Sequence, residues 1–165
     1  IFTNLPASEE AFEMGVAETT TSLAQALTPE GAQRLSNYGG VLITAAFFGH
    51  FFQHVRGTGS SNHPEDFQNG EFWKRHRKME EVLNNTFIYL PESLRLPGGS
   101  RNMNVIFIHM NIQASIIGLN RTALTTAGRY HVDPMIVRQC RARAFMAAEE
   151  IVSILQPTHK EDASR

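Results

Sequence analysis

Two histidines lie four residues apart in the chain, at His50 and His54. On a helix this spacing brings both imidazole rings to one face, where they could bind a metal ion. No carboxylate lies between them, so the metalloprotease motif is absent. Both histidines occur in a Phe-rich segment, where a hydrogen-bonded core histidine is the more common arrangement. We therefore predict no metal site in this chain.

Three polar residues further along have the spacing i, i+4 and i+11, which places them on one side of a helix: His109, Gln113 and Asn120. A second polar line runs beside them: Asn111, Ser115 and Thr122. Buried polar side chains need hydrogen-bond partners, so these lines could form an internal network, which is the favoured interpretation. They could instead form the floor of a pocket for a small-molecule effector. The first line is therefore a candidate effector site.

Residues 72–78 read FWKRHRK and contain a cluster of four cations: Lys74, Arg75, Arg77 and Lys78. Phe72 and Trp73 could stack on bases while the cations hold phosphates, which would make the segment a direct nucleic-acid-binding module. Glu80 and Glu81 follow immediately and would oppose that use. We favour a solvated helix face, or a charged interaction surface for another protein segment.

The sequence offers no catalytic motif. Neither G-x-S-x-G, nor a P-loop, nor G-x-G-x-x-G occurs, and no nucleophile lies beside a base at short range. We predict that the chain is not an enzyme, and a small all-α enzyme is the alternative. The single cysteine, Cys140, excludes a disulfide framework and a cysteine-rich zinc module, and its setting predicts a small core residue.

Composition and charge indicate which class of protein this chain belongs to. The chain has 165 residues, with 15 basic and 16 acidic residues, a net charge of −1 and 42% apolar residues. This is the balance of one globular domain, and a near-neutral charge disfavours a face that binds nucleic acid. The longest apolar stretch, residues 41–52, is too short to cross a membrane, because a crossing needs about 20 residues. We expect no contact with a membrane.

Apolar periodicity and capping residues predict helices at residues 6–18, 28–35, 36–56, 71–90, 104–130 and 134–156, and a short helical piece at 22–27. Thr28 and Asp133 are predicted N-caps, each followed by a proline. Residues 105–112 also alternate enough to suggest a strand, but the continuing apolar pattern favours a helix. We predict an all-α fold, a single irregular domain of about five or six helices at 1–156, and a polar tail at 157–165.

The loops and the core follow from the same pattern. Residues 57–70 are predicted to be an exposed loop, and residues 91–104 a loop with one helical turn at Glu92–Leu94. Apolar residues on the inward faces are expected to form the core: Phe12, Leu42, Phe47, Phe51, Met79, Leu83, Ile106, Ile112, Ile116, Leu119, Val137, Phe145, Ile151 and Leu155. The 41–52 helix is apolar nearly all round, so an uncovered part of it could lead the chain to self-associate.

Several blocks of the sequence resemble a known family: NLPASEEAFEMG (4–15), SLAQALTPEGAQRLS (22–36), FGHFFQHVR (48–56), GEFWKRHRKMEEVLNNTFIYLPESLRLP (70–97), NVIFIHMNIQASIIGLNRTAL (104–124) and CRARAFMAAEEIVSIL (140–155). They resemble the fungal-specific transcription factor domain. This is the regulatory middle region of fungal zinc binuclear cluster transcription factors, the group that includes xylanolytic activators. The resemblance runs in order through nearly the whole chain.

The resemblance implies an all-helical, non-enzymatic domain of a nuclear protein that tunes an activator. In the family, DNA is read by an N-terminal cluster of six cysteines that binds two zinc ions. This chain has only Cys140, so zinc and DNA contact are expected in another part of the parent protein. The chain begins with Ile1, and we expect it to be a fragment of that parent. Its expected partners are other segments of the parent protein, regulatory proteins, a small-molecule effector or a second copy.

Overall fold

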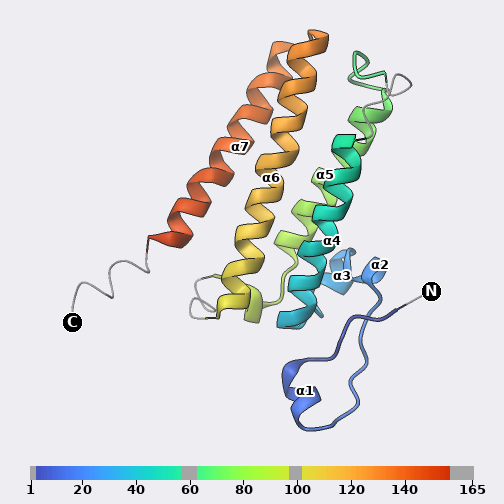
Figure 1. The fold of residues 1–165 in the computed structure, drawn as a ribbon, viewed down its shortest axis with the longest axis vertical. Coiled ribbons are helices and arrows are strands. Elements are labelled where there is room, and N and C mark those ends of the chain that lie inside the picture. Colours follow the sequence, from blue (N-terminus) through green and yellow to red (C-terminus); the bar gives the residue numbers. More distant parts are fainter. Residues whose placement is uncertain (1–2, 57–62, 97–101, 157–165) are drawn as a thin grey trace. The chain divides into compact units, whose positions relative to one another are not determined.

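The computed structural model describes residues 3–56, 63–96 and 102–156, except for the side chains of residues 52, 55 and 56. In these ranges the chain forms seven α-helices and one 3-10 helix (Figure 1): α1 (Glu9–Glu13), α2 (Leu23–Ala26), α3 (Pro29–Ala32), α4 (Asn37–Arg56), α5 (Glu71–Ile88), η1 (Glu92–Leu94), α6 (Met103–Tyr130) and α7 (Pro134–Leu155). The only β feature in the described ranges is an isolated bridge between Asn4 and Ser22. The all-α prediction is confirmed.

Contacts divide the chain into two compact units. The first unit comprises Ile1–Gly49 and Glu81–His109, and the second comprises His50–Glu80 and Met110–Arg165. Helices α4, α5 and α6 therefore each contribute one part to each unit. Whether residues 1–156 act as one domain stays a prediction, and the predicted tail at 157–165 lies outside the described residues.

The three short helices of the first unit begin at hydroxyl caps. Ser8, Ser22 and Thr28 each accept a hydrogen bond from a backbone N–H in the first turn of the helix that follows. The predicted cap at Thr28 is confirmed, with Pro29 in the first helical turn. Such caps satisfy backbone donors that have no partner inside a helix.

Helix α1 is shorter than predicted because of Gly15. This glycine has φ of 64°, in the left-handed region, directly after the C-cap Met14. Its N–H donates to Phe12 O, and the N–H of Val16 donates to Ala11 O at 2.9 Å. These two bonds form a Schellman motif, which ends a helix by satisfying its last carbonyls. Together with the N-cap at Ser8, this reduces the predicted helix over residues 6–18 to Glu9–Glu13.

The core of the second unit is built around two aromatic residues of α5. Phe72 and Trp73 have no exposed surface, and they pack with Ala123 and Ala127 of α6 and with Cys140 of α7. Burial raises the pKa of the Cys140 thiol, and the nearby Glu80 carboxylate adds to that shift. The prediction that Cys140 is a small core residue is confirmed.

The first unit has its own apolar core, with buried side chains from α4, α5, the connection that follows α5, η1 and the N-terminal part of α6: Ile43, Phe47, Leu83, Leu90, Leu94, Val105 and Ile108. The helical turn predicted at Glu92–Leu94 is confirmed as η1. On α4, the large apolar side chains described within 41–51 are buried or half-buried, so the expected exposed apolar surface does not lie there.

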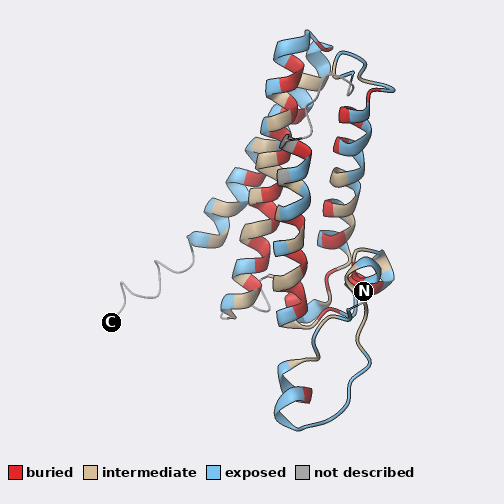
Figure 2. Cartoon of the chain, turned by 45° about the vertical axis from the view of Figure 1, so that its right-hand side comes forward, coloured by how far each residue is buried: buried red, intermediate tan, exposed pale blue. Residues whose placement is uncertain are grey.

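Three predicted core residues are exposed. Phe12 is 84% exposed on the one-turn helix α1, of which only Ala11 is buried (Figure 2). Phe145 is 66% exposed, because five residues separate it from the buried Cys140 and this turns it about 140° around the helix. Leu155, the last residue of α7, is 48% exposed. The other predicted core side chains are buried or half-buried.

The segment before α5 is largely exposed where the structure describes it, at residues 63–70, and residues 57–62 lie outside the described ranges. Among the described helices, none has both the length and the apolar character that a membrane crossing requires.

Candidate functional site

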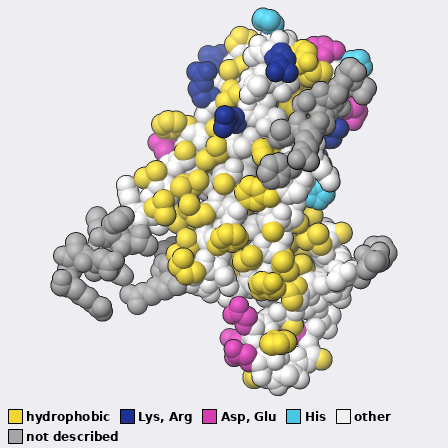
Figure 3. Space-filling view, in the orientation of Figure 1, with side chains coloured by type: hydrophobic (Ala, Val, Ile, Leu, Met, Phe, Trp, Pro, Cys, Tyr) yellow, Lys and Arg dark blue, Asp and Glu magenta, His cyan; other side chains and the backbone are white. Residues whose placement is uncertain are grey.

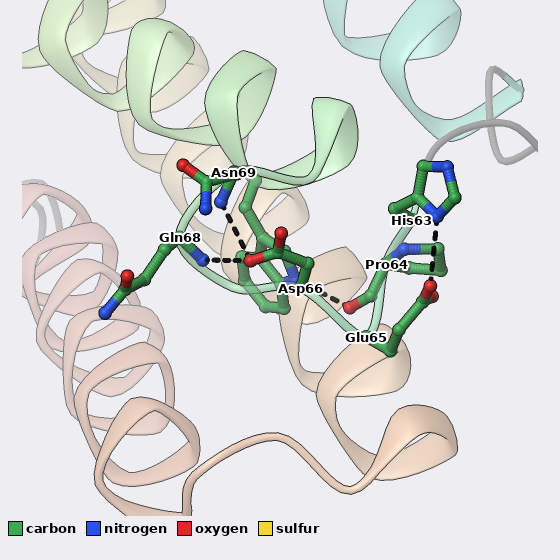
Figure 4. Close-up of polar contacts among 7 residues, drawn as sticks. His63, Pro64, Glu65, Asp66, Gln68 and Asn69 are labelled. Atoms are coloured by element: carbon green, nitrogen blue, oxygen red, sulfur yellow. Dashed lines mark hydrogen bonds and ion pairs between the residues drawn. The ribbon is translucent and has the colours of Figure 1, made fainter.

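The cation cluster at residues 74–78 lies on α5, directly after a tight turn formed by residues 63–70. In this turn the Asp66 carboxylate accepts hydrogen bonds from the backbone N–H groups of Gln68 and Asn69, at 3.0 and 2.9 Å (Figure 4). These bonds lower the pKa of Asp66. The turn requires Gly70, because a Cβ there would lie 2.1 Å from the carbonyl oxygen of His63. The turn therefore fixes where α5 begins.

Arg77 connects α5 to this turn. Its guanidinium donates to the carbonyl oxygens of Phe67 at 2.8 Å and Gln68 at 2.7 Å, and it lies over the Phe67 ring at 5.5 Å. These charge-assisted hydrogen bonds and this cation–π contact hold the Arg77 side chain against the turn. Of the four predicted surface cations, Arg77 therefore has a structural role.

The remaining cations are exposed on α5. Lys74 forms an ion pair with Glu71 one turn earlier, at 3.0 Å. Arg75 and Lys78 are also exposed. Such pairs on a helix surface stabilise it by a few tenths of a kcal/mol. Carboxylates flank the cations, at Glu71 and Glu81, so the exposed side of α5 carries both signs of charge.

The two aromatic residues of this segment face the opposite way. Phe72 and Trp73 are fully buried, their rings meet edge to face at 4.9 Å, and the indole N–H of Trp73 donates to Pro64 O at 2.8 Å. Neither ring is available to stack on a base. The hypothesis of a nucleic-acid-binding module that combines these aromatics with the cations is therefore wrong in its aromatic part.

A pair of histidines lies beside these rings. His54 of α4 stacks on Phe72 at 4.7 Å, and the His76 ring lies 6.0 Å from the His54 ring. Both ring nitrogens of His54 are buried and have no hydrogen-bond partner among the described residues. Burial, followed by the charges of His76 and Arg75, lowers the pKa of His54 to about 4. His54 is therefore neutral at physiological pH.

The favoured interpretation of His50 and His54 as hydrogen-bonded core histidines is wrong for both residues. His50 is exposed, and His54 is buried but has no hydrogen-bond partner among the described residues. The rings of Phe72 and His76 lie beside His54, and the spacing along the sequence did not suggest either neighbour. Within the described ranges, no three His, Cys, Asp or Glu side chains are grouped so that they could hold a metal ion.

Glu80 links α5 to α7. Its carboxylate accepts a hydrogen bond from Arg143 at 2.5 Å, and His76 Nε2 lies 3.6 Å from the same oxygen. Burial alone would raise the pKa of Glu80, but the interactions with His76 and Arg143 outweigh it and lower the pKa. Glu80 and Arg143 are 63 residues apart in the sequence, so no local pattern could have paired them.

The predicted effector residues are all buried, and the structure places them in different units. His109 belongs to the first unit, where its Nε2 donates to Leu94 O at 2.8 Å. Gln113 and Asn120 belong to the second unit, where Asn120 Nδ2 donates to Ile116 O at 2.9 Å. The Oδ1 atom of Asn120 has no partner in the part of the chain that the structure describes. The effector site stays a prediction.

The second polar line is satisfied within α6. Ser115 donates to Asn111 O at 2.8 Å, and Thr122 donates to Gly118 O at 3.0 Å. Bonds from a hydroxyl to the carbonyl four residues earlier are the usual way in which a helix accommodates a buried Ser or Thr. Ser115 and Thr122 thus form internal hydrogen bonds, as the favoured interpretation of this polar line expects.

A cavity of about 270 Å³ in the first unit lies next to His109. Its other lining residues are Phe87, Ile88, Arg95 and Leu96, and neither Gln113 nor Asn120 contributes to it. Arg95 donates from Nε to Leu90 O and from Nη2 to Ile88 O, both at 2.9 Å. Of the predicted effector residues, only His109 is among the residues that line this cavity.

The architecture and the surface define an all-α protein with a mixed-charge helix face and no grouped metal ligands in its described part. Comparison relates it to a fungal transcriptional activator: the chain is 24% identical over 156 residues to the pigment biosynthesis transcriptional activator pigB of Monascus ruber. The alignment covers 93% of this chain but only 28% of that protein. No family model matches the chain, and no solved structure matches it.

Proposed function

We propose that this chain is a regulatory region of a fungal transcription factor, of the fungal-specific transcription factor domain type, that does not itself contact DNA. The observation that carries this proposal is the similarity to pigB over nearly the whole chain, in a region that makes up 28% of that protein. In a nuclear parent protein, the remainder of the polypeptide would provide the DNA reader and the activating segment.

The chain's own residues do not fit a zinc cluster. A binuclear cluster needs six cysteine ligands, whereas this sequence has only Cys140, which is buried among apolar side chains. Zinc binding is therefore assigned to the parent protein outside this chain. We also place sequence-specific DNA contact outside this chain, and the burial of Phe72 and Trp73 and the bonding of Arg77 to the turn before α5 support this placement.

Regulation would act through contacts of this helical body with other segments, with proteins or with a small molecule. The cavity beside His109 supports the last of these routes, since Phe87 and Ile88 offer apolar contact and Arg95 adds a positive charge. Isothermal titration of His109→Ala against the unchanged protein tests this route with a panel of metabolites. Gln113→Ala distinguishes the two candidate sites. It should leave binding unchanged if the ligand occupies the cavity, and it should weaken binding if the ligand contacts His109, Gln113 and Asn120 together.

Two measurements test the proposal as a whole. In fluorescence anisotropy with a random 30-base-pair duplex, the 165-residue chain should bind weakly at low salt. Reversal of the exposed Lys74 and Lys78 to Glu should leave that binding nearly unchanged. Tight binding that falls steeply with salt and is lost in the double variant would instead make the chain a nucleic-acid-binding module.

The regulatory part of the proposal needs a reporter. The chain would be placed between an unrelated DNA-binding domain and a strong activation domain in a yeast strain. Reporter output should fall or become dependent on conditions, while the occupancy of the promoter stays constant. Unchanged output across growth conditions would contradict a regulatory role.

A further inference from the structure

The outward face of α7 exposes large apolar side chains. Phe145 is 66% exposed, Met146 is 67% exposed and Val152 is 53% exposed, while Cys140 and Ala147 of the same helix are buried on the other side. Figure 3 shows hydrophobic side chains gathered over α7. We define the α7 outer face by its exposed apolar residues: Ala142, Phe145, Met146, Ala148 and Val152. An exposed apolar face of this kind is typical of an interaction site, or of a surface that is prone to aggregation.

The α7 outer face has a shallow groove of about 370 Å³. Its lining includes Phe145, Ala148 and Val152 together with the polar residues Glu149, Ser153 and Gln156. These lining residues belong to α7 or, for Gln156, to its C-cap. The face therefore has a ridge of side chains beside a groove, and a second helix could pack its own ridge into that groove.

Charges are distributed unevenly along α7. Arg138 and Arg141 precede Phe145, whereas Glu149 and Glu150 follow it, and all four side chains are exposed. Arg141 and Glu149 are each four residues from Phe145, so the two charges are symmetric about it. In the described ranges, none of the four forms an ion pair; the third arginine of this stretch, Arg143, is bonded to Glu80.

We propose that two copies of this chain associate through their α7 outer faces as an antiparallel helix pair centred on Phe145. In that arrangement the basic half of one α7 lies opposite the acidic half of the other. A parallel pair would place like charges opposite each other, so the charge order selects the antiparallel one. An antiparallel pair has two-fold symmetry, and it closes as a dimer without leaving an open end.

The size of the face predicts a small interface. A helix of 22 residues is roughly 33 Å long. One helix pair of this length buries an area near or below the lower end of stable interfaces, about 1,200 Å² in total. The dimer is therefore expected to be weak, with a Kd of tens of micromolar, and to weaken further with salt because its charged residues lie at the rim.

Sedimentation equilibrium of the 165-residue chain, from about 1 to 300 μM, tests the proposal. The unchanged protein should shift from monomer to dimer, and Phe145→Ser should raise the Kd at least about tenfold, since it removes the central apolar contact. Phe12→Ser is the matched control: Phe12 is even more exposed but lies on α1, so its variant should dimerise like the unchanged protein. Far-UV circular dichroism checks that each variant is folded.

Charge reversal tests the orientation. Arg138→Glu with Arg141→Glu makes the whole face acidic, and Glu149→Arg with Glu150→Arg makes it basic, so each variant should dimerise more weakly. Combining all four changes restores opposite charges in an antiparallel pair and should restore dimerisation. A monomer at all concentrations would overturn the proposal and leave the face to another segment or protein. A dimer that is insensitive to Phe145→Ser, or equally sensitive to Phe12→Ser, would overturn it as well.

Discussion

The environment of His54 makes stability depend on pH in a defined way. This side chain is only 3% exposed, stacks on Phe72, and has no described partner for either ring nitrogen. Burial, together with the charges of His76 and Arg75, lowers its pKa from 6.5 to about 4. A proton on His54 in the folded protein would be buried beside other positive groups, with no acceptor for its N–H groups.

The sign and the size follow from proton linkage. Between pH 6.5 and 4 the unfolded chain carries a proton on His54 and the folded chain does not, so acid favours unfolding. The free energy of unfolding should be unaffected by this residue above pH 7. With a shift from 6.5 to about 4, we expect a loss of about 2 kcal/mol at pH 5 and about 3 kcal/mol below pH 4.

Urea unfolding at pH 7, 6 and 5 measures this loss. Trp73 is the single tryptophan and is buried in the same unit, so its fluorescence reports the transition, and far-UV circular dichroism provides a second probe. His54→Gln cannot take up the proton and should lose about 2 kcal/mol less between pH 7 and 5 than the unchanged protein. Glu80 does not interfere, because a lowered carboxyl pKa costs stability only below its unfolded value of 4.5.

The control is His50→Gln. His50 is on the same helix, four residues earlier, but is exposed, so its replacement should leave the pH dependence unchanged. Parallel stability curves for His54→Gln and the unchanged protein would refute the reasoning. So would an NMR titration in which the His54 ring takes up its proton near pH 6.5 while the protein is still folded.

Three further predictions test the core of the second unit. Trp73→Phe removes the hydrogen bond to Pro64 O and leaves a void, and it should lower the free energy of unfolding in urea by about 2 kcal/mol. Gly70→Ala should cost about 2 kcal/mol or more and lower Tm, because its Cβ would meet the His63 carbonyl at 2.1 Å. Cys140 should react with a thiol reagent at pH 8 at least about tenfold more slowly in the folded protein than in urea, because burial shields its sulfur from the reagent and also raises its pKa; equal rates would contradict its burial.

Much of the helical architecture could be predicted because its signals are local. Asp133 accepts a hydrogen bond from Met135 N at 2.7 Å and Pro134 occupies the first turn, so the predicted start of α7 is confirmed. The apolar periodicity of residues 104–130 is likewise sufficient to predict α6. A cap or a periodic stripe involves residues within one or two turns, and sequence alone specifies such contacts.

Helix α1 shows how a local signal can be outweighed by another. Apolar spacing suggested a helix up to residue 18, but Gly15 in the left-handed conformation ends it at Glu13. The glycine was visible in the sequence and is the typical residue of a helix C-terminus. The exposure of Phe12 is a consequence, because a helix of one turn offers little surface to pack against.

The orientation of side chains between distant segments could not be predicted. The pairing of Glu80 with Arg143, and of His54 with His76, depends on how helices pack, and sequence spacing within one helix does not encode it. For the same reason the predicted effector line was divided between two units, and the cavity beside His109 involves Arg95 instead of Gln113.

The segment FWKRHRK illustrates why composition alone misleads about function. A helix distributes seven consecutive residues around its whole circumference, so the aromatics and the cations of such a run need not face the same ligand. Here Phe72 and Trp73 are buried, while Lys74 and Lys78 are exposed one turn apart. Neighbouring residues of this segment thus have different environments: Phe72 and Trp73 lie in the core, and Lys74 and Lys78 lie at the surface. The same geometry leaves Phe145 facing outward on α7, where a residue type common in cores becomes the centre of a proposed interface.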